Sequence, residues 1–448
     1  MGETSVRGNV VIAEEREIEE FLNRLFPIAR SLTGEGNRET FRILQEIIPL
    51  EIIEYPSGTT VYDWTIPDEW VIRDAYIKDS DGQRLIDFSE CNLQIVGYSS
   101  PVRQKMTFSE LAPRLHLLEG NSEAIPYRTS YYNRDWGFCV TGVQYEQLRE
   151  VSGLLEVCID SEFNPEGSMT LGELRIRGEI EEEYLVSTYC CHPSMANDNL
   201  SGLLTTAFLA RDLYREHTLQ RSWRFVFLPE TIGAIAYLYH NEREMKKIRG
   251  GLLPTTCGGN GPWGFKESFL GDHLIDRAVQ LAFKDRCIQP IHYTFVPDGS
   301  DERQYSSPGF RIPVATISRD KYYEYSQYHT SLDNLDFVKG ASIAESLALY
   351  RDVVRILDQN TCYRSTVPCG EPQLGRRGLY PSTGGGINQP GSGETVESEL
   401  NAITWLLFLA DGNHDLLTTA ERSGLKFSDL LRVFGQLTVS GLIKPILN

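Results

Sequence analysis

The stretch that decides the fold is Tyr184 to Gly202, YLVSTYCCHPSMANDNLSG. An apolar, strand-like run delivers His192 at its carboxyl end, and Asp198 follows in an asparagine-rich loop. Ser201 and Gly202 then open a segment whose apolar residues recur at helical spacing. Open α/β sheets place their binding sites at this position, outside the carboxyl ends of the strands. We therefore expect a strand, a functional loop and a covering helix here.

The alternation of buried and amphipathic segments continues after this stretch. It runs through Trp223 to Leu228, Ile232 to Tyr239, Ile312 to Ser318 and Ala341 to Leu357. Short apolar runs that alternate with helical patterns are typical of a sheet whose two faces are both covered. We predict an α/β fold in which a mostly parallel sheet is flanked by helices.

The rest of the chain divides into units with different residue patterns. Residues 1–57 hold apolar positions at helical spacing and are predicted to complete the α/β core of residues 169–365. Between them, residues 58–168 consist of short β-rich runs separated by turn residues, which predicts an inserted β domain. Residues 366–394 are rich in Gly, Pro and Ser and are interpreted as a linker. Residues 395–448 have the helix-turn-helix-wing texture of a winged helix.

Composition and charge exclude several function classes. Hydrophobic residues at 41% and charged residues at 23% describe a globular chain, and no apolar run reaches the roughly 18–20 residues of a membrane span. The acidic N-terminus lacks a secretory pattern, so we expect a cytoplasmic protein. The nine cysteines form no regular framework and are expected to be reduced. A net charge of -19 disfavours nucleic acid and anionic membranes as partners.

His192 and Asp198 have the residue types of half a metal site. Catalytic zinc takes about three protein ligands from imidazole and carboxylate, and it leaves one position open for water. An ordinary hydrogen-bonded pair in a loop is the alternative interpretation of these two residues.

A second segment, WRFVFLPETIGAIAYL (Trp223 to Leu238), places Glu230 directly after a strand of the same kind. The two loops would then meet at neighbouring strand ends. A glutamate held beside activated water can accept its proton and return it to a leaving amine. The alternative is a carboxylate that only benefits from the dipole of the following helix.

Two later segments supply further polar residues. Asp301 lies in VPDGSDERQYSS (Val296 to Ser307), and His329 lies in YYEYSQYHTSLDNLDFV (Tyr322 to Val338). The alternatives are a surface turn for Asp301 and an ordinary solvent-side loop for His329.

In this order, the four segments resemble the zinc aminopeptidase family that includes bacterial leucyl aminopeptidase and the glutaminyl cyclases. More narrowly, the chain resembles bacterial aminopeptidase-like proteins that combine an inserted β domain with a C-terminal winged helix. Such proteins are often found with polysaccharide or secondary-metabolite genes. The resemblance spans nearly the whole chain and implies a zinc-exopeptidase-like sheet.

The resemblance implies roles for individual residues. His192 and His329 match the two metal-binding histidines of the family, and Asp198 matches the aspartate that bridges two metal ions. Glu230 matches the general base. Asp301 matches a Ser-Asp motif near the site, which implies that it orients a ligand or the base.

The chain departs from the family at two ligands. Thr231 replaces a metal-binding glutamate, and Leu253 to Gly258 contain no carboxylate where the family has an aspartate. Two imidazoles and one carboxylate remain, a set suited to one metal ion with an open water position. We therefore predict one Zn²⁺ per chain, bound by His192, Asp198 and His329.

Other residues could shape a substrate pocket. Arg303 follows Asp301 closely enough to bind a substrate carboxylate, and Tyr131, Tyr132 and Trp136 belong to an aromatic, polar-tipped run in the insert. If the insert caps the cleft, only small substrates would enter. The alternative is that these aromatic side chains form the core of the insert.

We predict a mononuclear zinc hydrolase that cleaves an amide or peptide bond in a small peptide-like or amino-acid conjugate, in a polysaccharide or secondary-metabolite pathway. Glu230 would assist the attack of zinc-bound water. The alternative is a catalytically inactive, aminopeptidase-like binding or scaffold protein. Cyclisation, as in glutaminyl cyclases, is disfavoured because their metal site uses the glutamate that Thr231 replaces.

The C-terminal unit is predicted to contact protein. Between Thr395 and Asn448, six acidic and four basic residues give a net charge of -2. A winged helix that reads DNA would carry Lys or Arg on its second helix. We therefore expect homo-oligomer formation through this unit and no nucleic-acid partner.

Overall fold

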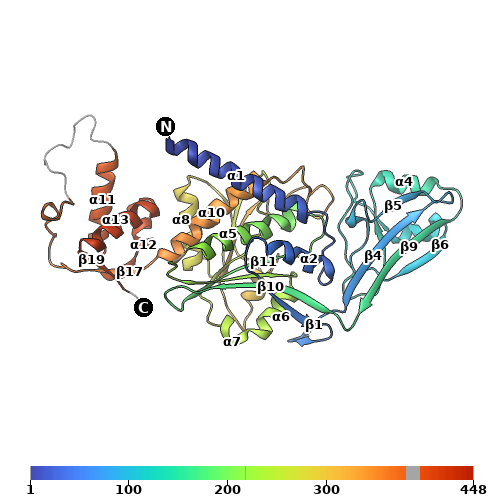
Figure 1. The fold of residues 1–448 in the computed structure, drawn as a ribbon, viewed down its shortest axis with the longest axis horizontal. Coiled ribbons are helices and arrows are strands. Elements are labelled where there is room, and N and C mark those ends of the chain that lie inside the picture. Colours follow the sequence, from blue (N-terminus) through green and yellow to red (C-terminus); the bar gives the residue numbers. More distant parts are fainter. Residues whose placement is uncertain (1, 217, 380–393, 447–448) are drawn as a thin grey trace. The chain divides into compact units, whose positions relative to one another are not determined.

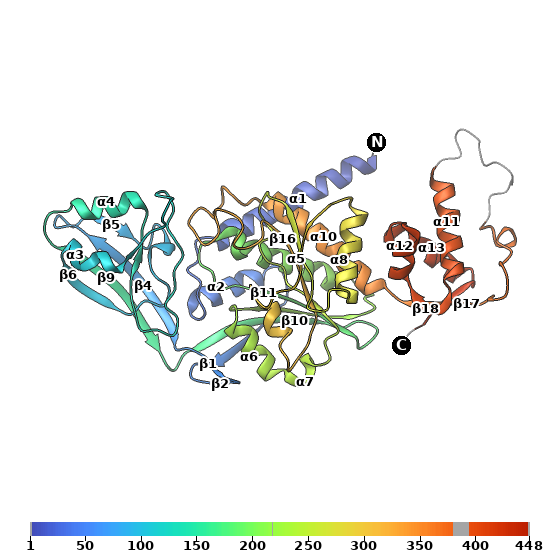
Figure 2. The same cartoon turned by 180° about the vertical axis from the view of Figure 1, so that it is seen from behind.

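The computed structural model describes residues 2–216, 218–379 and 394–446. The chain forms two compact units (Figures 1 and 2). The first comprises Met1–Ile275 and Pro290–Tyr350, and the second comprises Asp276–Gln289 and Arg351–Asn448. None of the helices in the described ranges is long and apolar enough to cross a membrane.

The first unit is built on an eight-stranded sheet with the strand order β1-β10-β12-β11-β13-β16-β14-β15. Its strands are β1 (Glu51–Pro56), β10 (Ser168–Ile176), β11 (Glu183–Tyr189), β12 (Ser222–Leu228), β13 (Gly251–Leu252), β14 (Trp263–Lys266), β15 (Ile291–Tyr293) and β16 (Val314–Arg319).

The large sheet is mixed, and the prediction of a mostly parallel sheet holds only for its centre. Strands β12, β11, β13 and β16 are parallel, as their apolar runs predicted. Towards the edges, β10 pairs with β1 and β12 in antiparallel fashion, and β14 pairs with β16 in the same way. An antiparallel neighbour needs no crossover helix, so the strand-helix alternation could not reveal it.

Helices cover both faces of this sheet. In Figures 1 and 2, α1, α2 and α5 lie on one side of it, and α6 and α7 lie on the other. Outside the stretch between β1 and β10, the helices of this unit are α1 (Gly2–Leu25), α2 (Glu35–Leu44), α5 (Gly202–Arg215), α6 (Ile232–His240), α7 (Glu242–Met245), α9 (Glu302–Tyr305) and the first half of α10 (Gly340–Gln359).

The stretch between β1 and β10 contains a smaller antiparallel sheet with the order β5-β4-β9-β6. One of the β-rich runs, Leu93 to Tyr98, forms no strand, because its start is a 3-10 turn (η1, Asn92–Gln94). The elements of the stretch are β2 (Thr60–Val61), β3 (Trp64–Thr65), β4 (Glu69–Lys78), β5 (Arg84–Asp87), β6 (Val102–Met106), α3 (Phe108–Leu111), β7 (Leu115–His116), β8 (Phe138–Cys139), α4 (Gly142–Glu150) and β9 (Leu155–Asn164).

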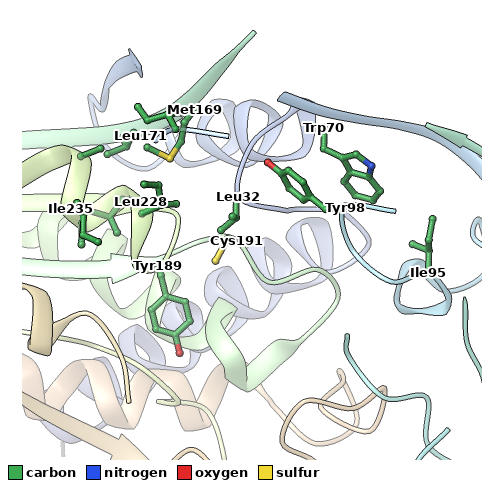
Figure 3. Close-up of a cluster of buried hydrophobic side chains, with 14 of the residues drawn as sticks. Leu32, Trp70, Ile95, Tyr98, Met169, Leu171, Tyr189, Cys191, Leu228 and Ile235 are labelled. Carbon is green, nitrogen blue, oxygen red and sulfur yellow. The ribbon is translucent and has the colours of Figure 1, made fainter. Parts of the chain in front are cut away.

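One apolar cluster joins this stretch to the large sheet. Figure 3 shows Leu171 and Leu228 of the large sheet, then Leu32 and Cys191, and then Trp70 of β4. All of these side chains are buried. Because burial of apolar area is the main stabilising contribution, the cluster fixes the chain that follows β11 against the insert. The limits of the insert at residues 58 and 168 stay a prediction, because one compact unit includes both.

The second unit consists of helices and a three-stranded sheet with the order β18-β17-β19. Part of the predicted linker, residues 380–393, lies outside the described residues. The elements are most of α8 (Leu274–Asp285), the end of α10, β17 (Cys362–Ser365), η4 (Gly375–Arg377), α11 (Glu394–Phe408), β18 (Asp411–Asp415), α12 (Leu416–Ser423), α13 (Phe427–Val439) and β19 (Ile443–Ile446).

Candidate functional site

The polar residues gather where the central strands end. Strands β11 and β12 are parallel neighbours in which Tyr189 is paired with Leu228. The two chains therefore leave the sheet side by side, and His192 and Glu230 follow them within three residues. His329 comes from the loop between β16 and α10. The edge is the one at which open α/β sheets bind ligands.

Three side chains converge there with the geometry of metal ligands. His329 Nε2 lies 3.1 Å from Asp198 Oδ2, and His192 Nε2 lies 4.0 Å from the same oxygen. One nitrogen from each histidine and one carboxylate oxygen lie within 4.8 Å of one another. Ligands around a tetrahedral zinc ion would be about 3.3 Å apart, given zinc–ligand distances near 2.0–2.2 Å.

The donors fit a zinc ion chemically as well as by distance. His329 Nε2 is buried, and its contact with Asp198 lacks hydrogen-bond geometry, so this nitrogen has no hydrogen-bond partner among the described residues. A neutral imidazole and an ionised carboxylate are the forms that bind metal. Burial lowers the pKa of His192 to about 4, which keeps this imidazole neutral at pH 7.

The site is closed on one side and open on the other. His192 and Asp198 are almost fully buried, whereas the side chains of His329 and Glu230 are 35% and 25% exposed. A substrate would therefore approach between the last two residues.

The two oxygens of Asp198 face different partners. Oδ2 faces both imidazoles, whereas Oδ1 accepts a hydrogen bond of 2.6 Å from the Tyr189 hydroxyl. That hydroxyl also lies 2.7 Å from Thr255 Oγ1. Burial alone would raise the pKa of Asp198, but His192, His329 and Tyr189 lower it to about 2.

Glu230 lies next to His192. Its Oε2 lies 3.9 Å from His192 Nε2, and its Oε1 accepts a hydrogen bond of 2.8 Å from Ser300 Oγ. Burial, with Asp301 and Asp198 nearby, raises the pKa of Glu230 well above its ordinary value, and the Ser300 hydroxyl opposes the shift. A carboxyl group with a raised pKa is suited to exchanging protons near neutral pH.

Asp301 lies in the interior, so the surface-turn alternative for this residue is wrong. Its Oδ1 accepts a hydrogen bond of 2.7 Å from the backbone N–H of Thr231, while its buried Oδ2 has no hydrogen-bond partner among the described residues. Burial raises the pKa of Asp301 to about 7. Asp301 thus holds the backbone directly after Glu230.

Of the predicted substrate-binding residues, the structure brings two close to this edge. The Tyr131 hydroxyl lies 3.0 Å from that of Tyr127, and burial, with Cys191 and Glu230 nearby, raises the pKa of Tyr131. Arg303 Nη2 donates to Thr231 Oγ1 at 3.2 Å, and its Nε is buried without a hydrogen-bond partner among the described residues.

The other two aromatic residues point elsewhere. The Tyr132 hydroxyl donates to the carbonyl of Thr65, and the Tyr132 ring contacts Trp64. The ring of Trp136 lies against the guanidinium of Arg114. Tyr132 is 48% exposed and so does not belong to the core of the insert, and the substrate-binding role of both side chains stays a prediction.

Sequence reasoning missed residues that hold the site together. Asp333 accepts hydrogen bonds from the backbone N–H groups of Asn197 and Asp198, at 2.6 and 2.9 Å, and is fully buried. The Tyr325 hydroxyl also donates a hydrogen bond of 3.1 Å to Asp333 Oδ2. The only available signal was that Asp333 lies four residues after His329 in a polar loop.

The insert also takes part in the site. The backbone N–H of Tyr127 donates to the carbonyl of His329 at 2.8 Å, and that of Ser331 donates to the carbonyl of Ile125 at 2.9 Å. The Tyr127 ring lies 5.2 Å from the ring of His192 and 5.1 Å from that of His329. The loop that carries His329 is therefore held by the insert.

Four residues other than glycine at this edge have backbone conformations with positive φ. Ser194, Thr231, His329 and Tyr131 have φ values of 36°, 64°, 54° and 44°. Such conformations cost on the order of 1–3 kcal/mol each for residues other than glycine, and they persist where the surrounding structure enforces them. Residues in such conformations often belong to functional sites.

Comparisons with known proteins give a consistent result. A family profile described as "Domain of unknown function (DUF4910)" matches residues 19–360, and a winged helix-turn-helix profile matches residues 361–445. A protein of Clostridium acetobutylicum, provisionally named a polysaccharide biosynthesis protein with an aminopeptidase-like domain, is 44% identical over 411 residues. The match covers 92% of each chain.

Solved structures extend the comparison to the fold. The crystal structure of a provisionally assigned peptidase from Clostridium acetobutylicum has a TM-score of 0.89 at 40% identity, covering 98% of this chain and 99% of that one. BSAP, a zinc aminopeptidase from Bacillus subtilis, has a TM-score of 0.57 at 12% identity, with 78% and 95% covered. At such low identity, the likeness to BSAP shows the fold alone.

Proposed function

Because the chain belongs to the DUF4910 family and has the fold of zinc aminopeptidases, we propose that it is a zinc-dependent hydrolase of amide or peptide bonds. The observation that carries the proposal is the convergence of His192 Nε2, Asp198 Oδ2 and His329 Nε2 at the ends of parallel strands. Glu230 stands beside this set, on its partly exposed side.

His192, Asp198 and His329 would hold the zinc ion. Bound there, zinc would supply a Lewis acid for the substrate carbonyl and would lower the pKa of water. Glu230 would accept a proton from the attacking water through Oε2 and pass it to the leaving nitrogen. Ser300 orients this carboxylate through Oε1, and Asp301 holds the following backbone.

A single zinc ion is supported by the surroundings of Asp198. Its Oδ1 is engaged by the Tyr189 hydroxyl, which leaves only Oδ2 directed at the imidazoles. The hydroxyl of Thr255 lies 2.7 Å from the same tyrosine oxygen. Thr255 belongs to the segment from Leu253 to Gly258, which contains no carboxylate. Asp198 would therefore bind a metal ion through Oδ2, while Tyr189 holds Oδ1.

The substrate would be a small conjugate that carries an anionic group. Arg303 has no carboxylate partner within 4.0 Å among the ion pairs of the described residues, and its bond to Thr231 places it next to Glu230. A guanidinium in this position suits a substrate carboxylate. The relative from Clostridium acetobutylicum is named for polysaccharide biosynthesis. Amides of amino acids and of amino sugars are therefore the substrates to screen.

The test is metal analysis of protein purified without an affinity tag, followed by hydrolysis assays on aminoacyl anilides and amide-linked amino sugars. We expect about one zinc ion per chain, which is lost in His192→Ala and in His329→Ala. His292→Ala is the matched control, because His292 is exposed and pairs with Glu267 away from the site.

The outcomes separate the parts of the proposal. Two zinc ions per chain in the wild type would overturn the single-metal site. Absence of zinc after incubation with the metal would overturn the enzyme proposal and favour the alternative of an aminopeptidase-like binding protein.

We further propose that the second unit contacts protein rather than DNA. Arg432 is the only basic residue of α13, and it is paired with Glu399. Phe408 and Val439 are 73% and 91% exposed at the ends of α11 and α13. Self-association, measured by analytical ultracentrifugation, should weaken in the Phe408→Ser/Val439→Ser variant, and unchanged association would contradict this role.

A further inference from the structure

A sulfur atom lies behind the proposed ligands. Cys191 directly precedes His192 and is 1% exposed, within the apolar cluster of Figure 3. Its Sγ lies 3.5 Å from His192 Nδ1. The same Sγ accepts a hydrogen bond of 3.3 Å from the backbone N–H of Glu230. One side chain therefore contacts both the proposed ligand and the backbone of the proposed base.

The contact matters because the two nitrogens of a metal-binding histidine have different tasks. One nitrogen offers its lone pair to the metal, and the other carries a proton that needs an acceptor, which fixes the tautomer and the ring orientation. In His192, Nε2 faces Asp198 and Glu230, so a zinc ion bound at Nε2 would leave the ring proton on Nδ1. Carboxylates or carbonyl oxygens usually accept this bond, but here the neighbouring atom is sulfur.

We propose that Cys191 is the positioning residue that sets the orientation of His192 and Glu230 together. Its sulfur accepts the Nδ1–H of His192 and the backbone N–H of Glu230, and this double contact joins the ends of β11 and β12. The inference rests on the proposed metal site, because it assigns the supporting contact of one ligand in that site.

Direct metal binding by the sulfur is the competing interpretation. Cys191, His192 and Glu230 also have ligand atoms within 4.8 Å of one another. However, Sγ lies on the Nδ1 side of the ring, whereas Asp198 lies on the Nε2 side. A single ion cannot bind in the ring plane at both nitrogens, so an ion shared with Asp198 excludes the sulfur.

Substitutions of Cys191 test the contact through zinc affinity, measured by competition with a chromophoric chelator. Cys191→Ala removes the acceptor and should weaken zinc binding about 10–100-fold, the usual effect of losing a partner of a ligand. Cys191→Ser retains an acceptor and should restore most of the affinity. Cys190→Ala is the matched control, since this neighbouring thiol is equally buried, and its affinity should equal that of the wild type.

Two spectroscopic measurements on the wild-type protein do not depend on whether a variant folds. In the zinc-loaded protein, ¹⁵N NMR should show the ring proton of His192 on Nδ1. In the cobalt-substituted protein, absorption should show no thiolate-to-cobalt charge-transfer band. The opposite tautomer, a charge-transfer band that Cys190→Ala retains, or full affinity in Cys191→Ala would each overturn the proposal.

The proposed function can fail separately. If the zinc-loaded wild type hydrolysed no amide, the enzyme proposal would fall, whereas the position of the ring proton of His192 in the same sample would still decide whether the sulfur accepts it.

Discussion

Neighbouring strands β11 and β12 each lead to a buried or half-buried carboxylate, and the two carboxylates have opposite properties. Asp198, after β11, faces two imidazoles and a tyrosine hydroxyl, and its pKa is lowered to about 2. Glu230, after β12, accepts one hydrogen bond from Ser300 and has acidic neighbours, so its pKa is raised.

The difference shows that surroundings, rather than residue type, assign the roles at this edge. A carboxylate that stays ionised is suited to hold a cation, and one that gains a proton readily is suited to proton transfer. Burial acts in the same direction on both groups. The sign of the net shift is therefore decided by the charged and polar groups that surround each carboxylate.

Exchanging each carboxylate for its amide should separate the two roles with the largest effects. Asp198→Asn should weaken zinc binding on the order of 10²-fold or more, because one of a few ligands contributes a large share of the roughly 10–16 kcal/mol typical of zinc sites. Glu230→Gln should retain zinc and lower turnover about 10²–10⁴-fold, the usual contribution of a general base.

Zinc content and single-substrate kinetics on the same preparations check this comparison. Asp336→Asn, an exposed residue of the His329 loop, serves as the control. Loss of zinc in Glu230→Gln together with retention in Asp198→Asn would reverse the assignment.

A substitution of Asp333 should have an intermediate effect, on stability rather than chemistry. Asp333→Ala leaves the buried N–H groups of Asn197 and Asp198 without their acceptor, at a cost of about 1–3 kcal/mol each. Thermal unfolding of the first unit should shift down by several degrees. Asp336→Ala, in the same loop, should not change the transition, and an equal shift in both variants would refute the role of Asp333.

Tyr189→Phe should have the smallest effect and sharpens the question of metal number. It removes the hydroxyl that engages Asp198 Oδ1, a hydrogen bond to a charged group worth about 1.5–3 kcal/mol. We expect weaker zinc binding by roughly tenfold, with one zinc ion per chain in elemental analysis. A second zinc ion in this variant would mean that the tyrosine, rather than missing ligands, limits the site to one.

The sequence predicted those features of the site that are local in the chain. The strand before His192, the helix after Asp198 and the position of Glu230 after a second strand follow from apolar periodicity, and the structure has them. Their proximity followed from the rule that parallel strands share one functional edge. The metal-binding and catalytic roles of these residues remain proposals.

The features that escaped prediction depend on contacts between distant residues. Asp333 bonds to Asn197 across 136 residues, and Tyr189 bonds to Thr255 across 66. Neither pairing leaves a periodic pattern. The hydrogen bond from Tyr132 to the carbonyl of Thr65 likewise joins residues 67 positions apart.

The hydrogen bond between Asp198 and Asp333 also determines when the site can form during synthesis of the chain. These residues are 135 positions apart, and ribosomes add about 5–20 residues per second, so roughly 7–27 s pass between them. During this interval the nascent loop has neither its anchoring carboxylate nor the second histidine. Acquisition of zinc should therefore be a late event on the ribosome, and pulse-labelled chains arrested before residue 329 should carry no tightly bound metal.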